Sequence, residues 1–393
     1  MRRVHFIGVC GTAMATLAAM LKARGDRVQG SDAHVYPPMS DFLRGEGITL
    51  LDGYDPAHVG EDLDLVVVGN AISRGNVELE AVLDRGIRYA SLPETIRETF
   101  LWDADAIVLA GTHGKTTTTA LTAWLLISGG LDPSVLVGGI ARNLGDGGGS
   151  YRLGQGGAFV IEGDEYDSAY FDKTAKFLKY LPKVAVIGNV EFDHADIYQD
   201  LDAVRLAFGR FVQLVPRRGL TLIGVDSPEA AALIPQARSR VQTFGLDARA
   251  TWRATDLRAD GERTAFTVQG PDGLTLQAVL PLLGAHNVRN ALAAVAVAHE
   301  RGLRSEAIVE GLRTFAGVKR RLEVVGERRG VTIYDDFAHH PTAVAETIAA
   351  LRAARPQGRI WAIFEPRSAT SCRRVFQADF EAAFAGADET VIA

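Results

Sequence analysis

Short runs of continuously apolar residues recur along the chain, and several are followed by apolar residues at helical spacing. The first run precedes Met14, Leu17 and Leu21, and a later run precedes Leu121 and Leu125. Unbroken apolar runs of this length are typical of strands that are buried on both faces of a parallel sheet. The runs are residues 65–68, 106–109, 158–161 and 184–187, and residues 4–7 form a similar run that contains His5. This alternation of strands and helices predicts an α/β fold with parallel sheets.

The pattern changes in residues 251–283, where polar and apolar residues alternate between turn signals. Alternation with a period of two predicts antiparallel strands, here inserted before a helix at 287–299. The glycine run at 147–150 predicts a flexible surface loop. We predict three domains, which are residues 1–104, 105–316 and 317–393.

The third predicted domain is the shortest. It has strands at 331–336, 360–364 and 389–393 and a helix at 345–353. A doubly wound domain contains more strand–helix units than these, so we expect a Rossmann-like domain that is incomplete.

Composition narrows the class of protein. The chain has 393 residues, 47% hydrophobic residues and a formal net charge of -6, and it has no basic run that would favour nucleic acid. The two cysteines, Cys10 and Cys372, lie far apart, which indicates a reducing compartment. No apolar stretch reaches about 18 residues, so no membrane span is predicted. We expect a soluble cytoplasmic protein that binds no nucleic acid.

A glycine-containing turn after the run at 106–109 is the strongest chemical signal. Its residues are Gly111, Thr112, His113, Gly114, Lys115, Thr116 and Thr117. A strand, a tight turn and Lys-Thr at a helix start together form a site for a nucleotide polyphosphate. Backbone N–H groups face the anion, Lys115 reaches the outer phosphates and the Thr116 hydroxyl can ligate Mg²⁺. Leu109 stands where the full Walker spacing has glycine, so this loop is a shortened variant.

Two later strands end in acidic or histidine-containing segments. The run at 158–161 is followed by Glu162, Asp164 and Glu165, and the run at 184–187 leads to Glu191 and His194. Carboxylates at this edge of a sheet can hold Mg²⁺ directly or through water. The alternatives are a solvated acidic loop and a structural histidine. We favour a metal site that includes Glu162 and His194.

Polar residues also open the helix at 287–299 and the third domain. Asn287 and Asn290 are one turn apart and could contact an adenine edge, although Asn287 is also a good N-cap. Arg320 and Arg321 could close over a phosphoryl group, although basic clusters are usually solvated.

The loop that ends the strand at 331–336 carries acids and histidines. Asp336, His339 and His340 lie between this strand and the next helix, which suits proton transfer or the orientation of an amine. The alternative is a capped helix start.

The turn after the first strand is a second candidate phosphate site. Cys10 and Ala13 stand where the dinucleotide fingerprint has glycines, which disfavours NAD. A diphosphate at the start of the following helix is still expected.

Six motifs occur in the order found in the Mur ligases, and this resemblance covers nearly the whole chain. They are Gly111-Thr112-His113-Gly114-Lys115-Thr116, Glu162-x-Asp164-Glu165, Glu191-Phe192-Asp193-His194, His286-Asn287-x-x-Asn290, Arg320-Arg321-Leu322-Glu323 and Asp335-Asp336-x-x-His339-His340-Pro341-Thr342. The chain most resembles the muramate-directed members. Segments 35–40, 165–167, 170–177 and Glu365-Pro366-Arg367-Ser368-x-Thr370 resemble those that transfer a whole peptide.

The resemblance implies a fold and a reaction. The fold would have a Rossmann-like N-terminal domain, a central P-loop ATPase domain with an antiparallel excursion, and a Rossmann-like C-terminal domain. The reaction would be the ATP- and Mg²⁺-dependent ligation of L-Ala-γ-D-Glu-meso-diaminopimelate to UDP-N-acetylmuramate through an acyl phosphate, in peptidoglycan recycling. The alternatives are ligation of L-alanine on the same scaffold and a nucleotide-binding switch that does not ligate.

The resemblance also implies roles for individual residues. Lys115 would hold the β- and γ-phosphates, and Thr116, Glu162 and His194 would serve Mg²⁺. Asn287 and Asn290 would contact adenine, Arg320 or Arg321 would contact phosphate, and Asp336, His339 and His340 would line the cleft near ATP or the amine. The residues implied for the UDP-sugar are Gly8, Cys10, Gly11, Thr12, Ser31, Asp32 and Asn70. The carbamylated lysine of several Mur ligases has no counterpart, because no lysine occurs between Lys183 and Lys319.

Overall fold

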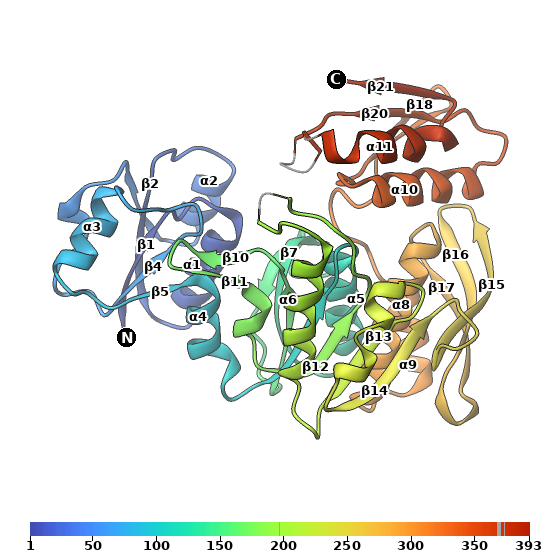
Figure 1. The fold of residues 1–393 in the computed structure, drawn as a ribbon, viewed down its shortest axis with the longest axis horizontal. Coiled ribbons are helices and arrows are strands. Elements are labelled where there is room, and N and C mark those ends of the chain that lie inside the picture. The colour runs from blue at the N-terminus through green and yellow to red at the C-terminus, as the bar shows by residue number, and fades with distance from the viewer. Residues whose placement is uncertain (196, 368–370, 373) are drawn as a thin grey trace. The chain divides into compact units, whose positions relative to one another are not determined.

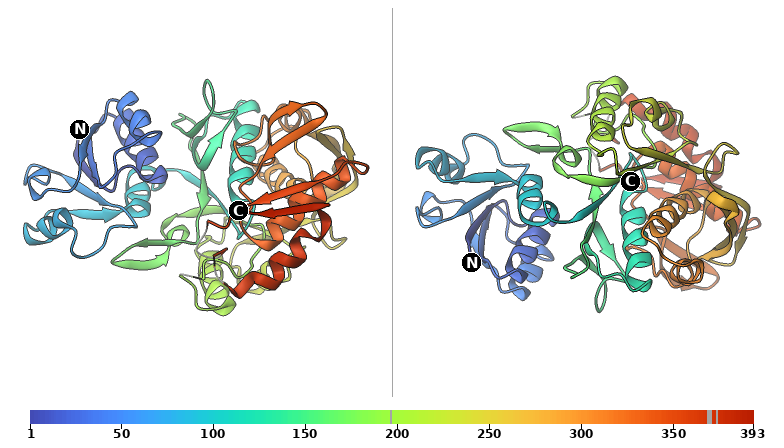
Figure 2. Two further views of the ribbon diagram at one scale, coloured as in Figure 1. Left: turned by 90° about the horizontal axis from the view of Figure 1, so that it is seen from above. Right: turned by 90° about the horizontal axis from the view of Figure 1, so that it is seen from below.

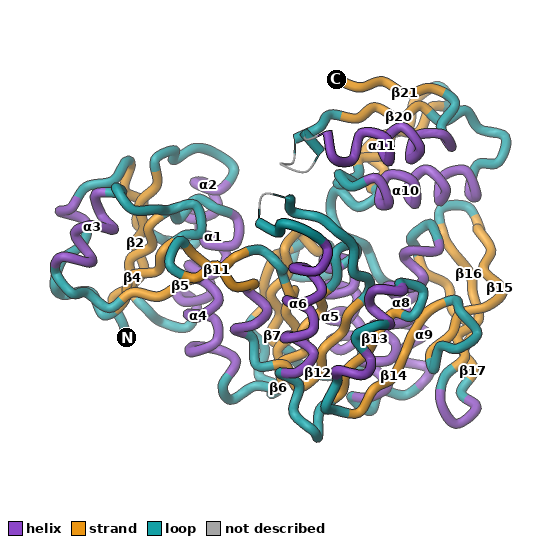
Figure 3. The backbone as a smooth tube through the Cα atoms, in the orientation of Figure 1, coloured by secondary structure: helices purple, strands orange, loops and turns teal. Residues whose placement is uncertain are grey.

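A computed structural model describes residues 1–195, 197–367, 371–372 and 374–393. They form two compact units, each described here by itself. Unit 1 comprises Met1–Ala104, Tyr151–Leu153 and Glu165–Leu181, and unit 2 comprises Asp105–Ser150, Gly154–Asp164 and Pro182–Ala393. Figure 3 shows that strands and helices alternate through most of the chain. None of the helices in the described residues combines the length and the apolar character that crossing a bilayer requires.

Unit 1 contains a five-stranded parallel sheet with the strand order β3-β2-β1-β4-β5. Its strands are β1 (Arg3–Ile7), β2 (Arg27–Asp32), β3 (Thr49–Asp52), β4 (Leu65–Val68) and β5 (Tyr89–Ser91). Its helices are α1 (Thr12–Ala23), α2 (Met39–Gly45), α3 (Val77–Asp84) and α4 (Leu92–Ile96). Every residue of β4 is buried, as its unbroken apolar run predicts.

A short hairpin that is distant in sequence joins unit 1. It consists of β10 (Asp167–Ala169) and β11 (Asp172–Ala175), which pair antiparallel. Asn70 Nδ2 donates to Asp167 Oδ1 at 2.9 Å, and the rings of Tyr89 and Phe171 meet edge to face at 5.2 Å. By sequence alone this hairpin falls within residues 105–316, because a strand of three or four residues carries no pattern that tells which core it joins.

Unit 2 is built on a ten-stranded sheet with the order β17-β16-β15-β14-β13-β12-β6-β9-β7-β8. The predicted antiparallel excursion is confirmed, because β15, β16 and β17 pair antiparallel at one edge. The strands are β6 (Asp105–Ala110), β7 (Ser134–Ala141), β8 (Gly149–Arg152), β9 (Ala158–Gly163), β12 (Pro182–Ile187), β13 (Leu220–Gly224), β14 (Arg240–Gly245), β15 (Trp252–Asp260), β16 (Arg263–Gln269) and β17 (Thr275–Leu280). The loop predicted at 147–150 is wrong in its second half, where β8 begins.

The order in which strands are added to the sheet of unit 2 reverses at β6, and this reversal positions the site. From β6 the chain passes through α5 to β7 on the β9 side, whereas from β12 it passes through α6 to β13 on the other side. Right-handed crossovers in opposite directions place the two helices on opposite faces, and Figure 1 shows α6 in front of the sheet. The helices are α5 (Lys115–Ser128), α6 (Leu201–Gln213), α7 (Pro228–Ala231), α8 (Ala285–Glu300) and α9 (Ser305–Arg313). Ligands bind at such a switch point in α/β sheets.

The remainder of unit 2 carries two small sheets and two helices. β18 (Glu323–Arg328) and β19 (Val331–Asp335) pair antiparallel, and β20 (Trp361–Phe364) and β21 (Glu389–Ile392) pair parallel. Figures 1 and 2 show α10 (Pro341–Ala354) and α11 (Gln377–Ala383) side by side.

The strand at 331–335 does not join the sheet of β20 and β21, as a doubly wound arrangement would require. It forms a hairpin with β18 across the glycine at 330, because Gly330 adopts a φ of 76° that suits a tight turn. Overall, the predicted α/β class with parallel sheets is confirmed.

Candidate functional site

The glycine turn between β6 and α5 has the backbone that the sequence predicts for a phosphate loop. Gly111 and Gly114 have φ angles of 140° and 80°. Lys115 Nζ donates to the carbonyl of Gly111 at 2.8 Å and to that of Thr112 at 3.2 Å. The amine is therefore folded over the turn at the start of α5, where N–H groups and the helix dipole favour an anion.

Thr116, Glu162 and Arg321 meet beside this turn, although they come from three distant segments. The Thr116 hydroxyl donates to Glu162 Oε1 at 3.1 Å, and Arg321 Nη2 donates to the Thr116 hydroxyl oxygen at 3.1 Å. Gly138 N donates to Glu162 Oε2 at 2.8 Å. A Cβ at Gly138 would lie 2.7 Å from Glu162 Oε2, so only glycine leaves room for this carboxylate. A hydroxyl and a carboxylate are the hard oxygen ligands that Mg²⁺ prefers, so these residues fit the ion.

Burial raises the pKa of Glu162, and the positive charge of Lys115 is the largest opposing influence. A partly buried carboxylate that is costly to ionise is stabilised in its charged form by a cation nearby. Glu162 is therefore suited to bind a divalent ion, and a bound ion would lower its pKa.

His194 lies in the loop after β12 and has a φ of 55°. The backbone N–H of His194 donates to Asp193 Oδ1 at 2.6 Å. Its backbone carbonyl accepts from the backbone N–H groups of Ile197 and Tyr198 at 2.8 and 2.9 Å. These contacts fix the conformation of the loop around His194. Its role as a ligand of Mg²⁺ stays a prediction, and Asp196 of the same segment lies outside the described residues.

Asn287 and Asn290 lie in the first turns of α8. The helix begins at Ala285 with Gly284 as its N-cap, so the alternative that Asn287 is the cap is wrong. Asn287 Nδ2 donates to the carbonyl of Leu283 at 2.8 Å, and Asn290 Nδ2 donates to Asn287 Oδ1 at 3.3 Å. A Cβ built on Gly114 would lie 2.5 Å from Asn290 Oδ1. Asn290 thus lies against the turn, and the adenine contacts stay a prediction.

Arg320 and Arg321 contact the same aromatic ring. Each guanidinium carbon lies 5.1 Å from the ring centroid of Phe337. Arg320 also forms an ion pair with Asp335 at 3.4 Å, whereas Arg321 reaches Thr116. Of the two, Arg321 is therefore the one that the structure brings to the phosphate turn.

Asp336 organises the loop before α10. Its carboxylate accepts from Leu322 N at 2.6 Å and from Ala338 N at 2.8 Å, and burial raises its pKa. His339 Nδ1 lies 2.9 Å from the carbonyl of Phe337 and must donate to it, because a carbonyl only accepts. Burial lowers the pKa of His339, so its imidazole is neutral at pH 7.

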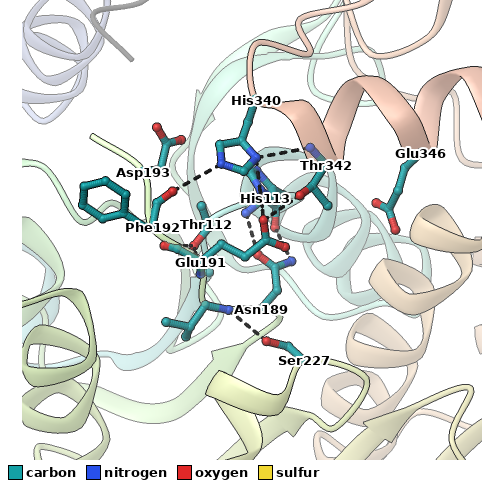
Figure 4. Close-up of polar contacts among 12 residues, drawn as sticks. Thr112, His113, Asn189, Glu191, Phe192, Asp193, Ser227, His340, Thr342 and Glu346 are labelled. Atoms are coloured by element: carbon teal, nitrogen blue, oxygen red, sulfur yellow. Dashed lines mark hydrogen bonds and ion pairs between the residues drawn. The ribbon is translucent and has the colours of Figure 1, made fainter. Parts of the chain in front are cut away.

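His113, Glu191 and His340 form a cluster that we call the His-Glu-His cluster (Figure 4). Glu191 Oε2 lies 3.3 Å from His113 Nε2 and 3.6 Å from His340 Nδ1, and it accepts from the Thr342 hydroxyl at 2.7 Å. Burial by itself would raise the pKa of Glu191, but the hydrogen bond and charge of His113 and the hydrogen bond from Thr342 outweigh it and hold the pKa at about 2. Glu191 is therefore ionised at neutral pH.

Glu191, Asn189 and Thr342 are site residues that the sequence analysis did not assign. Asn189 Oδ1 accepts from His113 N at 2.8 Å, and the Asn189 carbonyl accepts from Thr112 N at 3.0 Å. The signal that could have identified them is their position, because Asn189 and Glu191 directly follow the end of β12, the strand beside the phosphate turn.

An open pocket of about 440 Å³ lies beside the cluster. Glu191, Phe192, His340, Thr342 and residues of α10 and α11 line it. It therefore gives solvent and small ligands access to one side of the cluster.

In unit 1, the turn after β1 has a different environment. Gly8 has a φ of 83° and donates its N–H to the carbonyl of Ser31 at 2.9 Å. Cys10 N donates to Asp32 Oδ2 at 2.8 Å, and Gly11 is the N-cap of α1, which begins at Thr12. This turn thus has a helix N-terminus, and the Asp32 carboxylate already accepts a hydrogen bond from its backbone.

Two other residues predicted for the UDP-sugar have partners inside unit 1. The Ser31 side chain is fully buried and its hydroxyl donates to Glu78, while Asn70 donates to Asp167. Their roles toward a UDP-sugar stay predictions.

The switch-point location, the shortened phosphate turn and the partly buried acid near the end of β9 define an α/β protein of the nucleotide-binding class. Three family models match successive parts of the chain. Residues 3–100 match the Mur ligase family, catalytic domain, residues 109–298 match the Mur ligase middle domain, and residues 320–393 match the Mur ligase glutamate ligase domain. The chain belongs to the Mur ligase family.

Curated relatives and a solved structure narrow the similarity. The chain is 41% identical over 390 residues to the UDP-N-acetylmuramate–L-alanyl-gamma-D-glutamyl-meso-2,6-diaminoheptandioate ligase of Haemophilus influenzae, covering 99% of this chain and 84% of the relative. It is 40% identical over 399 residues to the UDP-N-acetylmuramate–L-alanine ligase of Sinorhizobium fredii, covering 99% and 81%. A crystal structure of a murein peptide ligase from Psychrobacter arcticus superposes with a TM-score of 0.81 at 38% identity, covering 100% of this chain and 84% of that one.

Proposed function

We propose that this chain is an ATP-dependent ligase that joins the tripeptide L-Ala-γ-D-Glu-meso-diaminopimelate to UDP-N-acetylmuramate. The proposal is supported by the similarity over 99% of the chain to a ligase whose name gives this reaction. The structural observation that carries it is the meeting of Lys115, Thr116, Glu162 and Arg321 at the phosphate turn. The three domains at residues 1–104, 105–316 and 317–393 are part of the same proposal, except that the hairpin of β10 and β11 belongs to unit 1.

ATP and Mg²⁺ are the co-substrate and ion that these residues fit. Thr116 and Glu162 would hold the Mg²⁺ ion, with His194 as a further ligand. Bound Mg²⁺ would neutralise the outer phosphates during attack by an anion. Lys115 and Arg321 add two positive charges at the same turn, so the early repulsion between a carboxylate and the γ-phosphate is reduced.

In the proposed reaction, a muramyl carboxylate oxygen attacks the γ-phosphorus and ADP leaves, which forms an acyl phosphate. The peptide amine then attacks the acyl carbon, phosphate leaves and the amine loses a proton. His339 is suited to accept this proton, because its Nδ1 is bonded to the Phe337 carbonyl and its Nε2 carries the lone pair. Asp336 holds the loop that carries His339.

The experiment that tests the substrate uses the full chain with ATP, Mg²⁺ and UDP-N-acetylmuramate. Either the tripeptide or free L-alanine is added, and phosphate release and the mass of the product are measured. We expect turnover with the tripeptide and little with L-alanine. Turnover with L-alanine alone would favour a second candidate function, the ligation of L-alanine to UDP-N-acetylmuramate. The 40% identity to an L-alanine ligase supports this second function. ATP hydrolysis that is indifferent to both the UDP-sugar and the amine would instead favour a nucleotide-binding switch.

A further inference from the structure

The His-Glu-His cluster has the composition of a transition-metal site. Its residues come from the phosphate turn, the loop after β12 and the start of α10. Two imidazoles and a carboxylate are ligands that suit Zn²⁺, whereas Mg²⁺ prefers oxygen ligands alone. We propose that His113, Glu191 and His340 bind one divalent transition-metal ion of the Zn²⁺ type, at a site separate from Thr116 and Glu162. This inference does not rest on the proposed ligase function.

The distances between the three side chains also fit ligands that share one ion. In a tetrahedral site with ligands about 2.0–2.1 Å from the metal, neighbouring ligand atoms lie about 3.3–3.4 Å apart. Glu191 Oε2 lies 3.3 Å from His113 Nε2 and 3.6 Å from His340 Nδ1, and the three ligand atoms all lie within 4.8 Å of one another. Charge-assisted hydrogen bonds are shorter, at about 2.7–2.9 Å.

Neighbouring groups orient the ligands as they do in known metal sites. His340 Nε2 lies 3.2 Å from the carbonyl of Phe192 and must donate to it, so the lone pair is on Nδ1. A metal-binding histidine usually donates its other ring N–H to a carbonyl or a carboxylate in this way. The Thr342 hydroxyl holds Glu191 Oε2 at 2.7 Å. The long bond from Thr342 N to His340 Nδ1, 3.3 Å, is the contact that a bound ion would replace.

The surroundings supply a further ligand type and access. The Glu191 carboxylate places an oxygen ligand beside the two imidazoles. The open pocket lined by Glu191 and His340 provides a route for the ion and room for a water as fourth ligand. An ion at this site would connect His113, two residues before Lys115, to the start of α10.

The test is metal binding by the full chain, without ATP or UDP-sugar. Zn²⁺ is titrated in competition with a chromophoric chelator, and Co²⁺ is added in a separate experiment to record its visible absorption. We expect one tight equivalent of Zn²⁺ and a Co²⁺ spectrum of tetrahedral intensity. Glu191→Gln and His113→Gln should each weaken Zn²⁺ binding at least 100-fold. Circular dichroism and the melting temperature show whether each variant is folded, and the two variants provide independent tests if one of them does not fold.

Matched controls separate this site from its neighbours. His339→Gln removes the adjacent histidine of the same loop, and Glu346→Gln removes another acid of α10, one that pairs with Arg289. Glu162→Gln removes the carboxylate of the predicted Mg²⁺ site. All three should retain the tight equivalent of Zn²⁺. The proposal is wrong if no stoichiometric binding occurs, if Glu191→Gln and His113→Gln bind as the parent does, or if Glu162→Gln abolishes the same equivalent.

Discussion

The chain has two glycine turns that each connect a parallel strand to a helix, and their surroundings differ. In unit 1, the turn after β1 has Cys10 N bonded to Asp32 and no lysine in the turn. In unit 2, the turn after β6 has Lys115 folded over its carbonyls and Thr116 in contact with Glu162 and Arg321. Both turns offer a helix N-terminus to an anion.

The difference indicates that the backbone of each turn favours binding of an anion, whereas the side chains around the turn determine which anion is bound. The helix start in unit 1, where Asp32 already accepts a hydrogen bond from Cys10 N, is suited to a diphosphate that is bound but does not react. A helix start with two cations and a partly buried carboxylate is suited to a triphosphate and a divalent ion, where charge must be neutralised during reaction. We therefore expect substitutions in the two turns to have separable effects.

Removal of the Lys115 side chain should show the difference between the two turns most strongly. Lys115→Ala should lower kcat for phosphate release by about 10³-fold, because a charge that acts on the transition state is lost. The affinity for UDP-N-acetylmuramate, measured by calorimetry, should not change, since the predicted sugar site lies in unit 1. Lys183→Ala, which removes an exposed ion pair with Asp105, is the control. Equal loss of turnover and of UDP-sugar affinity would contradict the assignment of the two turns.

Alanine at matched glycines should have unequal effects on stability. Gly114 has a φ of 80°, and an added Cβ would meet Asn290 Oδ1 at 2.5 Å. Gly11 has a φ of -64°, and the nearest atom to its Cβ would be at 3.8 Å. Gly114→Ala should therefore lose about 1–2 kcal/mol from the left-handed backbone alone, with weaker ATP binding in addition. Gly11→Ala should melt close to the parent in thermal unfolding, and a larger loss for Gly11→Ala than for Gly114→Ala would reverse the interpretation.

The two units should also differ in the pH dependence of their stability. Burial, and then the charge of Arg289, lower the pKa of His286 in unit 2 from 6.5 to about 4. Between these values the unfolded chain binds a proton that the folded chain does not, so the free energy of unfolding falls as the pH falls from 6.5 to 4. In unit 1, burial of Glu78 is outweighed by hydrogen bonds from His5 and Ser31, which lower its pKa below 4.5. Its contribution is present above pH 4.5 and is lost below it.

Thermal unfolding from pH 7 to pH 3 measures this difference. His286→Gln should flatten the decline of the melting temperature between pH 6.5 and 4.5 and leave a decline at lower pH in place. An unchanged slope in the variant would exclude His286 as the source.

The strands and the phosphate turn were largely predictable from the sequence, but their neighbours were not. The apolar runs at 106–109, 158–161 and 184–187 correspond to β6, β9 and β12, because continuous burial leaves a clear pattern. The sequence groups the hairpin at 167–175 with residues 105–316, whereas it belongs to unit 1, and no strand is predicted at β13, because strands of three to five residues leave little pattern. Ser368 and Thr370, part of one family motif, lie outside the described residues.

The α/β class, the phosphate turn with Lys115 and Thr116, and the family with its motifs in fixed order follow from the amino-acid sequence. Each of these depends on residues that are close in the chain. The contacts of Arg321 with Thr116 and of Glu191 with His113 and His340 follow from the folded structure alone. The physical reason is that these contacts join segments up to 227 positions apart along the chain (113 and 340), and local spacing contains no information about which distant segments a folded sheet brings together.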